Sequence, residues 1–143
     1  CYTGGLELAL SCDLLVASET AKFADTHGKW GMTPRWGMSQ RLPRRIGPLK
    51  AKEMSFTART YSGAEAAAMG LANHCVADDQ LEDVVGAVAA DIVANSWHSA
   101  RGNKMLYNKG QDYTFHDGLA FEMAESPGRG PDIEERLKAF SKS

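Results

Sequence analysis

The residues that could do chemistry stand at the start of the chain, where two glycines precede a glutamate. Gly4 and Gly5 lead into a predicted helix over residues 6–11, with Thr3 as a plausible N-cap. The first N–H groups of a helix have no partners within it and lie at the positive end of its dipole. They would stabilise an oxygen that gains negative charge in a reaction. Glu7 follows one turn into the helix, near enough to serve the same site as an acid or base.

A second interpretation of these residues stays open. A Gly-Gly pair is common at turns, and so short a motif often occurs without function. A glutamate in the first turn of a helix also interacts favourably with the helix dipole, whether or not it is catalytic. The pattern by itself is therefore compatible with an ordinary helix start.

The elements that would position these residues alternate between short strands and helices. Residues 14–17 are a continuous apolar run that suits a strand covered on both faces, and two further short strands are expected within residues 21–25 and 72–76. The segment between the first two strands and the next helix, residues 26–33, contains two glycines and is predicted to be a loop.

Helix signals are clear in the middle of the chain. Thr33 and Pro34 predict a helix that runs through Arg41, because a capping hydroxyl precedes a proline at the first helical position. Ser62 with Glu65 three residues later predicts a capping box for a helix that Gly70 ends. Helices are predicted over residues 34–41 and 63–69 from these signals, and a further helix is predicted over residues 48–57.

From residue 79 onward the pattern becomes helical. Apolar residues at helical spacing predict a long amphipathic helix that reaches about Asn95. Three more helices are predicted, over residues 96–110, 115–124 and 132–140. Their apolar stripes exceed what one small core needs, which suggests an association surface; the alternative is that they pack only on their own chain.

Composition excludes several classes of function. With 143 residues, 43% of them hydrophobic, and a net charge of −2, the chain is expected to be a globular protein that does not bind nucleic acid. Its three cysteines form no CxxC pair, so neither a zinc site nor a disulfide framework is expected, and a reducing, cytoplasmic location fits best. No run of apolar residues is long enough to predict a membrane span.

The first fifteen residues after Tyr2, Thr-Gly-Gly-Leu-Glu-Leu-Ala-Leu-Ser-Cys-Asp-Leu-Leu-Val-Ala, resemble the signature of the enoyl-CoA hydratase/isomerase (crotonase) superfamily. The likeness continues, in order and with family-like spacing, through most of the chain. It includes Phe23-Ala24-Asp25, Gly31-Met32-Thr33-Pro34, Gln40-Arg41-Leu42, Arg45-Ile46-Gly47, Ala64-Glu65-Ala66 and Gly70-Leu71-Ala72. The resemblance implies an α/β fold, in which a partial crotonase-like core of the ββα superhelix precedes a C-terminal α-helical module.

The resemblance also implies a domain organisation. The chain resembles the C-terminal half of a crotonase-type protein, with residues 1–95 as the C-terminal part of the spiral core and the N-terminal half absent. In the family, the N-terminal half carries much of the coenzyme A contact surface and the second N–H of the oxyanion hole. Residues 96–143 would form a helical oligomerisation module, and the expected assembly is a homotrimer or a dimer of trimers.

The chemistry that the resemblance implies is the addition of water across the double bond of a 2-enoyl-CoA. The thioester oxygen becomes enolate-like in the transition state, and two backbone N–H groups stabilise it. By motif match Gly4 supplies one of these, and Glu7 matches the first catalytic glutamate. Gly5, Trp30 and Trp36 are candidate substrate-binding residues, although such tryptophans are more often packing residues. No metal and no cofactor are expected, since coenzyme A is part of the acyl-CoA substrate.

One position departs from the family pattern. Typical hydratases carry a second glutamate twenty residues after the first, and this chain has His27 there. Histidine, with an unperturbed pKa of about 6.5, can move protons in either direction. On an extended backbone Asp25 would share the side of His27, where it would orient the ring or replace the missing carboxylate. Three interpretations of His27 stay open. It is a catalytic acid–base, or it shapes the substrate site while Glu7 acts alone, or the protein binds acyl-CoA without hydrating it.

Three functions follow from these alternatives. The first is an enoyl-CoA hydratase in which Glu7 is the principal acid–base, assisted by His27 and Asp25. The second is a double-bond isomerase, in which one carboxylate shuttles a proton between carbons. The third is a non-catalytic acyl-CoA-binding protein of the same fold.

Overall fold

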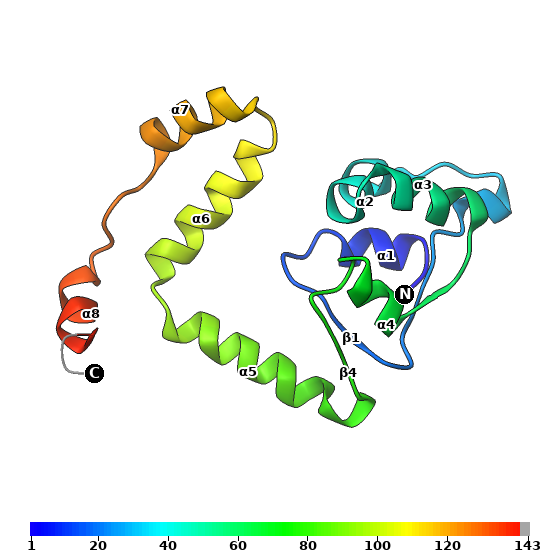
Figure 1. The fold of residues 1–143 in the computed structure, drawn as a ribbon, viewed down its shortest axis with the longest axis horizontal. Coiled ribbons are helices and arrows are strands. Elements are labelled where there is room, and N and C mark those ends of the chain that lie inside the picture. The colour runs from blue at the N-terminus through cyan, green and yellow to red at the C-terminus, as the bar shows by residue number, and fades with distance from the viewer. Residues whose placement is uncertain (141–143) are drawn as a thin grey trace. The chain divides into compact units, whose positions relative to one another are not determined.

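A computed structural model describes residues 1–140 of the chain. The chain forms two compact units, Cys1–Val85 and a second unit that begins at Gly86, so that the boundary falls inside helix α5 (Leu81–Ala94). The first unit contains both short sheets and the residues at which chemistry is expected, whereas the second is helical (Figure 1).

The first unit alternates short helices and strands, which confirms the α/β class. Its elements are α1 (Gly4–Ala9), β1 (Val16–Ser18), β2 (Lys22–Phe23), the 3₁₀ helix η1 (His27–Trp30), α2 (Met38–Ile46), α3 (Pro48–Thr57), β3 (Tyr61–Ser62), α4 (Gly63–Ala68), β4 (His74–Val76), the 3₁₀ helix η2 (Asp78–Gln80) and the start of α5.

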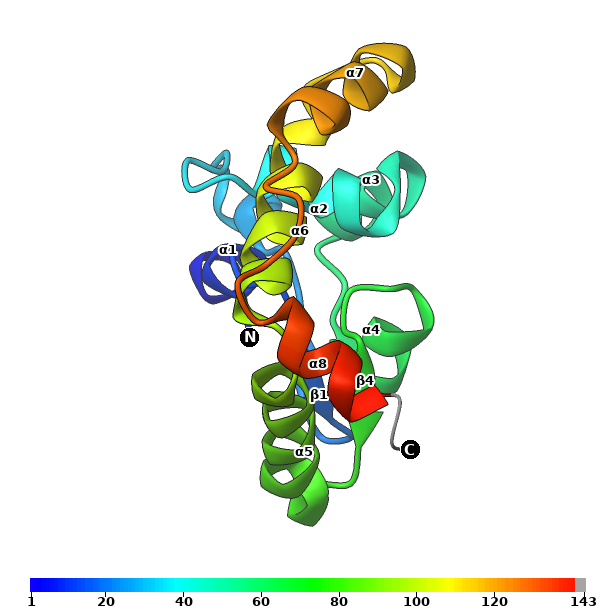
Figure 2. The same cartoon turned by 90° about the vertical axis from the view of Figure 1, so that its left-hand side faces the viewer.

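The strands pair in two small sheets. β1 and β4 are parallel, with Ala17 opposite Cys75, and they run side by side in Figure 2. β2 and β3 are antiparallel, with Phe23 opposite Tyr61. The helix that follows β3 packs very closely on β1, since Gly63 at the start of α4 approaches the carbonyl of Ser18. A glycine is needed there because its missing Cβ leaves room for that carbonyl.

One hydrophobic core holds the first unit together. Leu6 from α1, Met38 from α2, Met54 from α3 and Leu71 are each at most 1% exposed. α2 and α3 lie beside each other (Figure 1) and both contribute to this core. The core therefore fixes α1, α2 and α3 relative to one another, and these are the helices that surround the candidate site.

The capping box that the sequence predicts for α4 is confirmed. The hydroxyl of Ser62 accepts the N–H of Glu65 at 3.2 Å, and Glu65 Oε2 accepts the N–H of Ser62 at 2.8 Å. The hydrogen bonds that Ser62 donates to the Glu65 carboxylate, led by the one from its backbone N–H, lower the pKa of Glu65 below its usual value because they stabilise the carboxylate form. Two donors that a helix start leaves unpaired are thereby satisfied.

Other local predictions are wrong in their boundaries. α2 begins at Met38 and not at Thr33 or Pro34, and it continues past Pro43 to Ile46. β1 begins at Val16, two residues later than expected, and Leu14 is 46% exposed. The predicted loop over residues 26–33 includes the single turn of η1. Short elements like these depend on tertiary partners, so their ends are poorly specified by local pattern.

The second unit contains α6 (Trp97–Gly110), α7 (Phe115–Glu125) and α8 (Ile133–Phe140). The turn before α6 is tied to the start of α8, because the Ser96 hydroxyl donates to Asp132 Oδ1 at 2.9 Å and Arg136 donates to the Ala94 carbonyl at 3.0 Å. Among residues 1–140, no helix combines the length and the apolar character that crossing a bilayer requires.

Replacing Gly63 by alanine tests the close contact between α4 and β1. The added Cβ would overlap the Ser18 carbonyl oxygen, which is backbone and cannot rotate away. We expect the free energy of unfolding to fall by about 1–3 kcal/mol, as for other overpacked sites. The matched change Gly86→Ala meets open space within α5 and should raise stability by about 0.5–1 kcal/mol. Urea denaturation of both variants measures the two changes in the free energy of unfolding. Equal changes in the two variants would contradict the close contact between Gly63 and the Ser18 carbonyl.

The capping box predicts a pH dependence of stability. Because the pKa of Glu65 is lowered from 4.5 on folding, its carboxylate stabilises the fold above that value, and this contribution is lost as the pH falls through the lowered pKa. Glu65→Gln should therefore lower the melting temperature at pH 7, with the difference from the parent protein shrinking towards acid pH. The change Glu122→Gln on the exposed face of α7 serves as a control without a capping contact. A pH-independent difference would contradict this assignment.

Candidate active site

Three buried ionisable side chains lie together in the first unit. Glu7, Asp25 and His27 are 3%, 2% and 8% exposed, and they are the buried polar or charged residues within the described part of the chain. Burying such groups is costly unless each polar atom has a partner. In residues 1–140 no buried side-chain nitrogen or oxygen lacks a hydrogen-bond partner. The sequence-predicted catalytic residues are therefore brought to one place.

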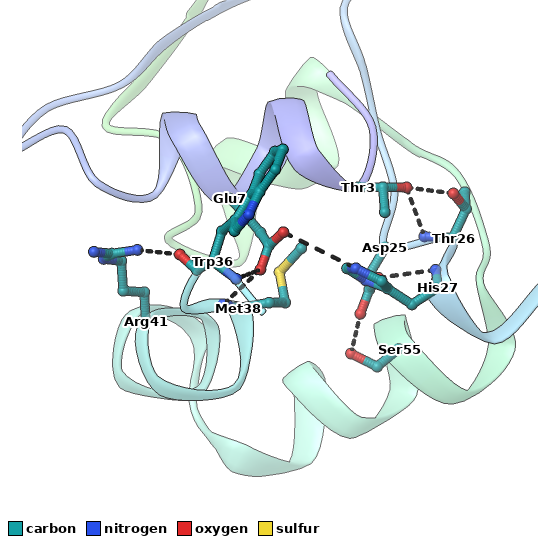
Figure 3. Close-up of polar contacts among 9 residues, drawn as sticks. All are labelled: Thr3, Glu7, Asp25, Thr26, His27, Trp36, Met38, Arg41 and Ser55. Atoms are coloured by element: carbon teal, nitrogen blue, oxygen red, sulfur yellow. Dashed lines mark hydrogen bonds and ion pairs between the residues drawn. The ribbon is translucent and has the colours of Figure 1, made fainter. Parts of the chain in front are cut away.

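The carboxylate of Glu7 joins α1 to the start of α2 (Figure 3). Its Oε1 accepts the backbone N–H of Trp36 at 2.9 Å and that of Met38 at 3.2 Å. Met38 is the first residue of α2, so a buried negative group occupies the end of that helix where the dipole is positive. This contact explains why α2 does not begin at Pro34: the N–H groups of residues 36 and 38 are engaged by Glu7, and Gly37 turns the chain between them with φ 104°.

Asp25 holds His27 through the ring and the backbone. Asp25 Oδ1 lies 2.6 Å from His27 Nδ1 and accepts the backbone N–H of His27 at 3.2 Å. The hydroxyl of Ser55, from α3, donates to Asp25 Oδ2 at 2.7 Å. Because both carboxylate oxygens already accept hydrogen bonds, we assign Nδ1 of His27 as a donor. Nε2 is then the free nitrogen of a neutral ring.

The free nitrogen of His27 faces Glu7. Nε2 lies 3.9 Å from Glu7 Oε2, which is the carboxylate oxygen that α2 does not engage (Figure 3). This distance is longer than a direct hydrogen bond, so the two groups are adjacent without being locked together. The arrangement offers one carboxylate and one imidazole that face a common point.

Backbone pairing keeps the two halves of the site together. Tyr2 forms a parallel bridge with Ala24, and the N–H of Thr3 donates to the Ala24 carbonyl at 2.9 Å. The hydroxyl of Thr3 contacts that of Thr26 and accepts the Thr26 N–H at 3.3 Å. Thr3 stands at the N-cap position of α1, as predicted, with φ 50°, although its hydroxyl makes no capping bond. It links α1 to the segment that carries Asp25 instead.

A groove of about 550 Å³ opens beside Glu7. It is lined by Gly4, Gly5, Glu7, Leu8, Ser11, Trp36 and Arg41. The ring of Trp36 stands directly over Gly4, where a Cβ would come within 2.9 Å of the ring. Arg41 donates to the Trp36 carbonyl at 2.6 Å and so helps to hold this residue in place. The candidates Gly4, Gly5, Glu7 and Trp36 thus share one groove.

The remaining candidate, Trp30, lies elsewhere. It ends η1 with 70% of its surface exposed and is not among the residues that line this groove. At the start of α1, the N–H of Gly5 donates to the Tyr2 carbonyl at 2.8 Å and the N–H of Glu7 to the Thr3 carbonyl at 2.9 Å. Within residues 1–140 no acceptor is assigned to the N–H of Gly4, which is the group that the motif predicts as an oxyanion donor.

Two contributors to the site were not found from the sequence. Ser55 lies on a predicted helix thirty residues from Asp25, and nothing in the local pattern around it indicates a partner there. Arg41 lies at the end of a helix that the sequence predicts, yet it donates to the Trp36 carbonyl and lines the groove. Arg41 follows Gly37 by four residues, which is about one helical turn, and its guanidinium lies where a side chain at Gly37 would be. This spacing is the sequence signal that could have indicated the contact.

Within residues 1–140 no group of three or more His, Cys, Asp or Glu side chains is placed to hold a metal ion. What the site does offer is a carboxylate, an imidazole backed by a second carboxylate, and a helix-start N–H at the edge of a groove. Such a set can move protons to and from a bound molecule and can stabilise a developing negative charge.

Known proteins resemble this chain over most of its length. The sequence model of the enoyl-CoA hydratase/isomerase family matches residues 1–141, so the likeness is not confined to one half of this chain. A probable enoyl-CoA hydratase of Mycobacterium leprae is 38% identical over 96% of the chain and 58% of its own length. The short-chain-enoyl-CoA hydratase of Clostridium acetobutylicum is 36% identical over 96% of the chain and 52% of its own length. The chain thus spans about half the length of these relatives.

The fold is shared as well. The crystal structure of an enoyl-CoA hydratase from Bacillus anthracis superposes with a TM-score of 0.94 at 34% identity, and the match covers 99% of this chain and 56% of the other. This similarity confirms the predicted crotonase-like fold. Family model, relatives and structure point the same way: the chain belongs to the enoyl-CoA hydratase/isomerase family.

Proposed function

We propose that the protein containing this chain hydrates the double bond of a 2-enoyl-CoA thioester. The observation that carries the proposal is the juxtaposition of Glu7 Oε2 and His27 Nε2, 3.9 Å apart, beside a groove edged by Gly4. Hydration needs one group to take a proton from water and one to return it to carbon, and these two groups supply both functions.

The thioester is proposed to lie in the groove with its carbonyl oxygen at the N–H of Gly4. That N–H belongs to the first turn of α1, where the unpaired donors of a helix favour negative charge. The ring of Trp36 and the side chain of Leu8 line the groove and provide apolar surface for the carbon chain. A side chain at Gly4 would require the ring of Trp36, which stands over it, to move.

The proton transfers can be written without an outside donor. Neutral His27 takes a proton from water at Nε2 as the water oxygen bonds to C3; the electron pair of the C2–C3 double bond shifts to C1–C2, and that of the carbonyl moves to the thioester oxygen. Asp25, already bonded to Nδ1, stabilises the imidazolium that forms. The imidazolium then passes this proton to Glu7, which delivers it to C2 as the enolate collapses to the thioester, so His27 is neutral and Glu7 is a carboxylate again.

The substrate, partners and location of the whole protein belong to the same proposal. We propose an acyl-CoA thioester as the substrate and no cofactor beyond it. A trimer or dimer of trimers built through residues 96–143 is supported by exposed apolar side chains there, such as Phe115 and Met123. Three free thiols favour a reducing cytoplasm.

The role of Glu7 is tested by Glu7→Gln in the purified protein that contains this chain. The amide oxygen can still accept from Trp36 and Met38, so the fold and the melting temperature should be kept. The rate of crotonyl-CoA hydration should fall at least about a hundredfold, because the amide cannot transfer protons. Glu19→Gln, an exposed site, should leave the rate unchanged. Hydration at the parent rate in Glu7→Gln would show that Glu7 is not the acid–base.

Separate assays with 2-enoyl-CoA and 3-enoyl-CoA test the reaction itself. We expect the 2-enoyl thioester to lose its conjugated ultraviolet absorbance and to yield the 3-hydroxy product, because the site carries two proton-transferring groups of different kinds. Appearance of conjugation from the 3-enoyl thioester, without hydration of the 2-enoyl one, would identify an isomerase. Tight binding of both without turnover would identify a non-catalytic acyl-CoA-binding protein.

A further inference from the structure

The structure assigns a role to Ser55 that neither the sequence motif nor the family match indicates. We propose that Ser55 is a positioning residue, which holds Asp25 so that His27 presents Nε2 to Glu7. The inference rests on the proposed function for its catalytic meaning, but the hydrogen-bonded chain from Ser55 to His27 can be tested without turnover.

The first step in the argument is the way in which Asp25 is satisfied. Its carboxylate is 2% exposed, so water cannot be its main partner. Oδ1 is used twice by His27, through the ring at 2.6 Å and the backbone N–H at 3.2 Å. Oδ2 has the Ser55 hydroxyl at 2.7 Å as its assigned partner within residues 1–140. Without Ser55 one oxygen of a buried carboxylate would be left unpaired, and such groups move or take up water.

The second step is the rigidity of the donor. Ser55 lies on α3 directly after Met54, which is fully buried in the core, and one turn after Ala51, which is 6% exposed. The same helix lies against η1, since a Cβ at Gly28 would come within 3.3 Å of the Ser55 carbonyl oxygen. α3 is therefore fixed on both sides of Ser55, and Figure 3 shows its hydroxyl directed at Asp25.

The third step connects Asp25 to the reacting nitrogen. Fixing Asp25 Oδ1 on Nδ1 favours the tautomer in which the proton is on Nδ1 and the lone pair is on Nε2. The ionisable groups that face the ring in the described chain are Asp25, two residues before it in sequence, and Glu7 from α1, while α3 contributes the neutral Ser55. A weaker hold on Asp25 would release the ring and change its tautomer.

The test is nitrogen-15 NMR of the histidine rings in the parent protein, with the His27 signals identified by their loss in His27→Gln. We expect neutral His27 to be in the Nδ1–H form. Ser55→Ala should lower the share of that form and speed exchange of the ring proton with water about tenfold, the equivalent of one hydrogen bond to a charged group. Thr57→Ala removes a hydroxyl on the same helix that donates to the Glu53 carbonyl, and it should change neither signal.

Turnover provides the second readout. If His27 is the proton acceptor, Ser55→Ala should lower kcat for crotonyl-CoA about tenfold with KM nearly unchanged, and the limb of the pH–rate profile that belongs to His27 should move. Unchanged ring signals in Ser55→Ala would overturn the positioning role even in an active enzyme. Altered ring signals with no hydration in the parent protein would keep the hydrogen-bonded chain and reject the proposed function.

Discussion

The burial of one carboxylate constrains much of the first unit. Glu7 lies in the interior on a short helix, and its Oε1 must be satisfied by protein donors because water has little access. The donors are the N–H groups of Trp36 and Met38. The segment between β2 and α2 must therefore pass beside Glu7 at the point along the chain where α2 begins. That requirement sets the start of α2, the turn at Gly37 and the position of the Trp36 ring over Gly4.

The second carboxylate solves the same problem differently. Asp25 is satisfied by His27 and by Ser55, and not by the start of a helix. Its contact with Nδ1 turns the other ring nitrogen towards Glu7 Oε2. Two buried acids with separate partners thus place an imidazole between them, where a pair of glutamates is typical of related hydratases. The exchange of a carboxylate for an imidazole changes the charge of the site in each protonation state, but it preserves two groups able to move protons.

Much of the fold follows from local pattern. The capping box of Ser62 and Glu65, the proline at the start of α3 and the serine before α6 each predict a helix whose start the structure confirms to within a residue. Strands β1 and β4 each begin two residues later than expected. Each has three residues, and its bounds are set by pairing with the other strand, which local pattern does not show. The site was predicted in part: Glu7, Asp25 and His27 are together, but Trp30 is apart and Ser55 was missed.

The sequence by itself determined the helix start with Gly4, Gly5 and Glu7, since residue type and spacing along one helix are local properties. Through its resemblance to the family, the sequence also predicted His27 at the position of a second glutamate. Only the tertiary structure decided which way His27 faces, which donor completes Asp25 and where α2 begins. These features depend on residues about twenty to thirty positions apart that come into contact only in the folded core. Buried polar atoms need hydrogen-bond partners, and a short-range sequence pattern does not show which distant residue supplies the partner.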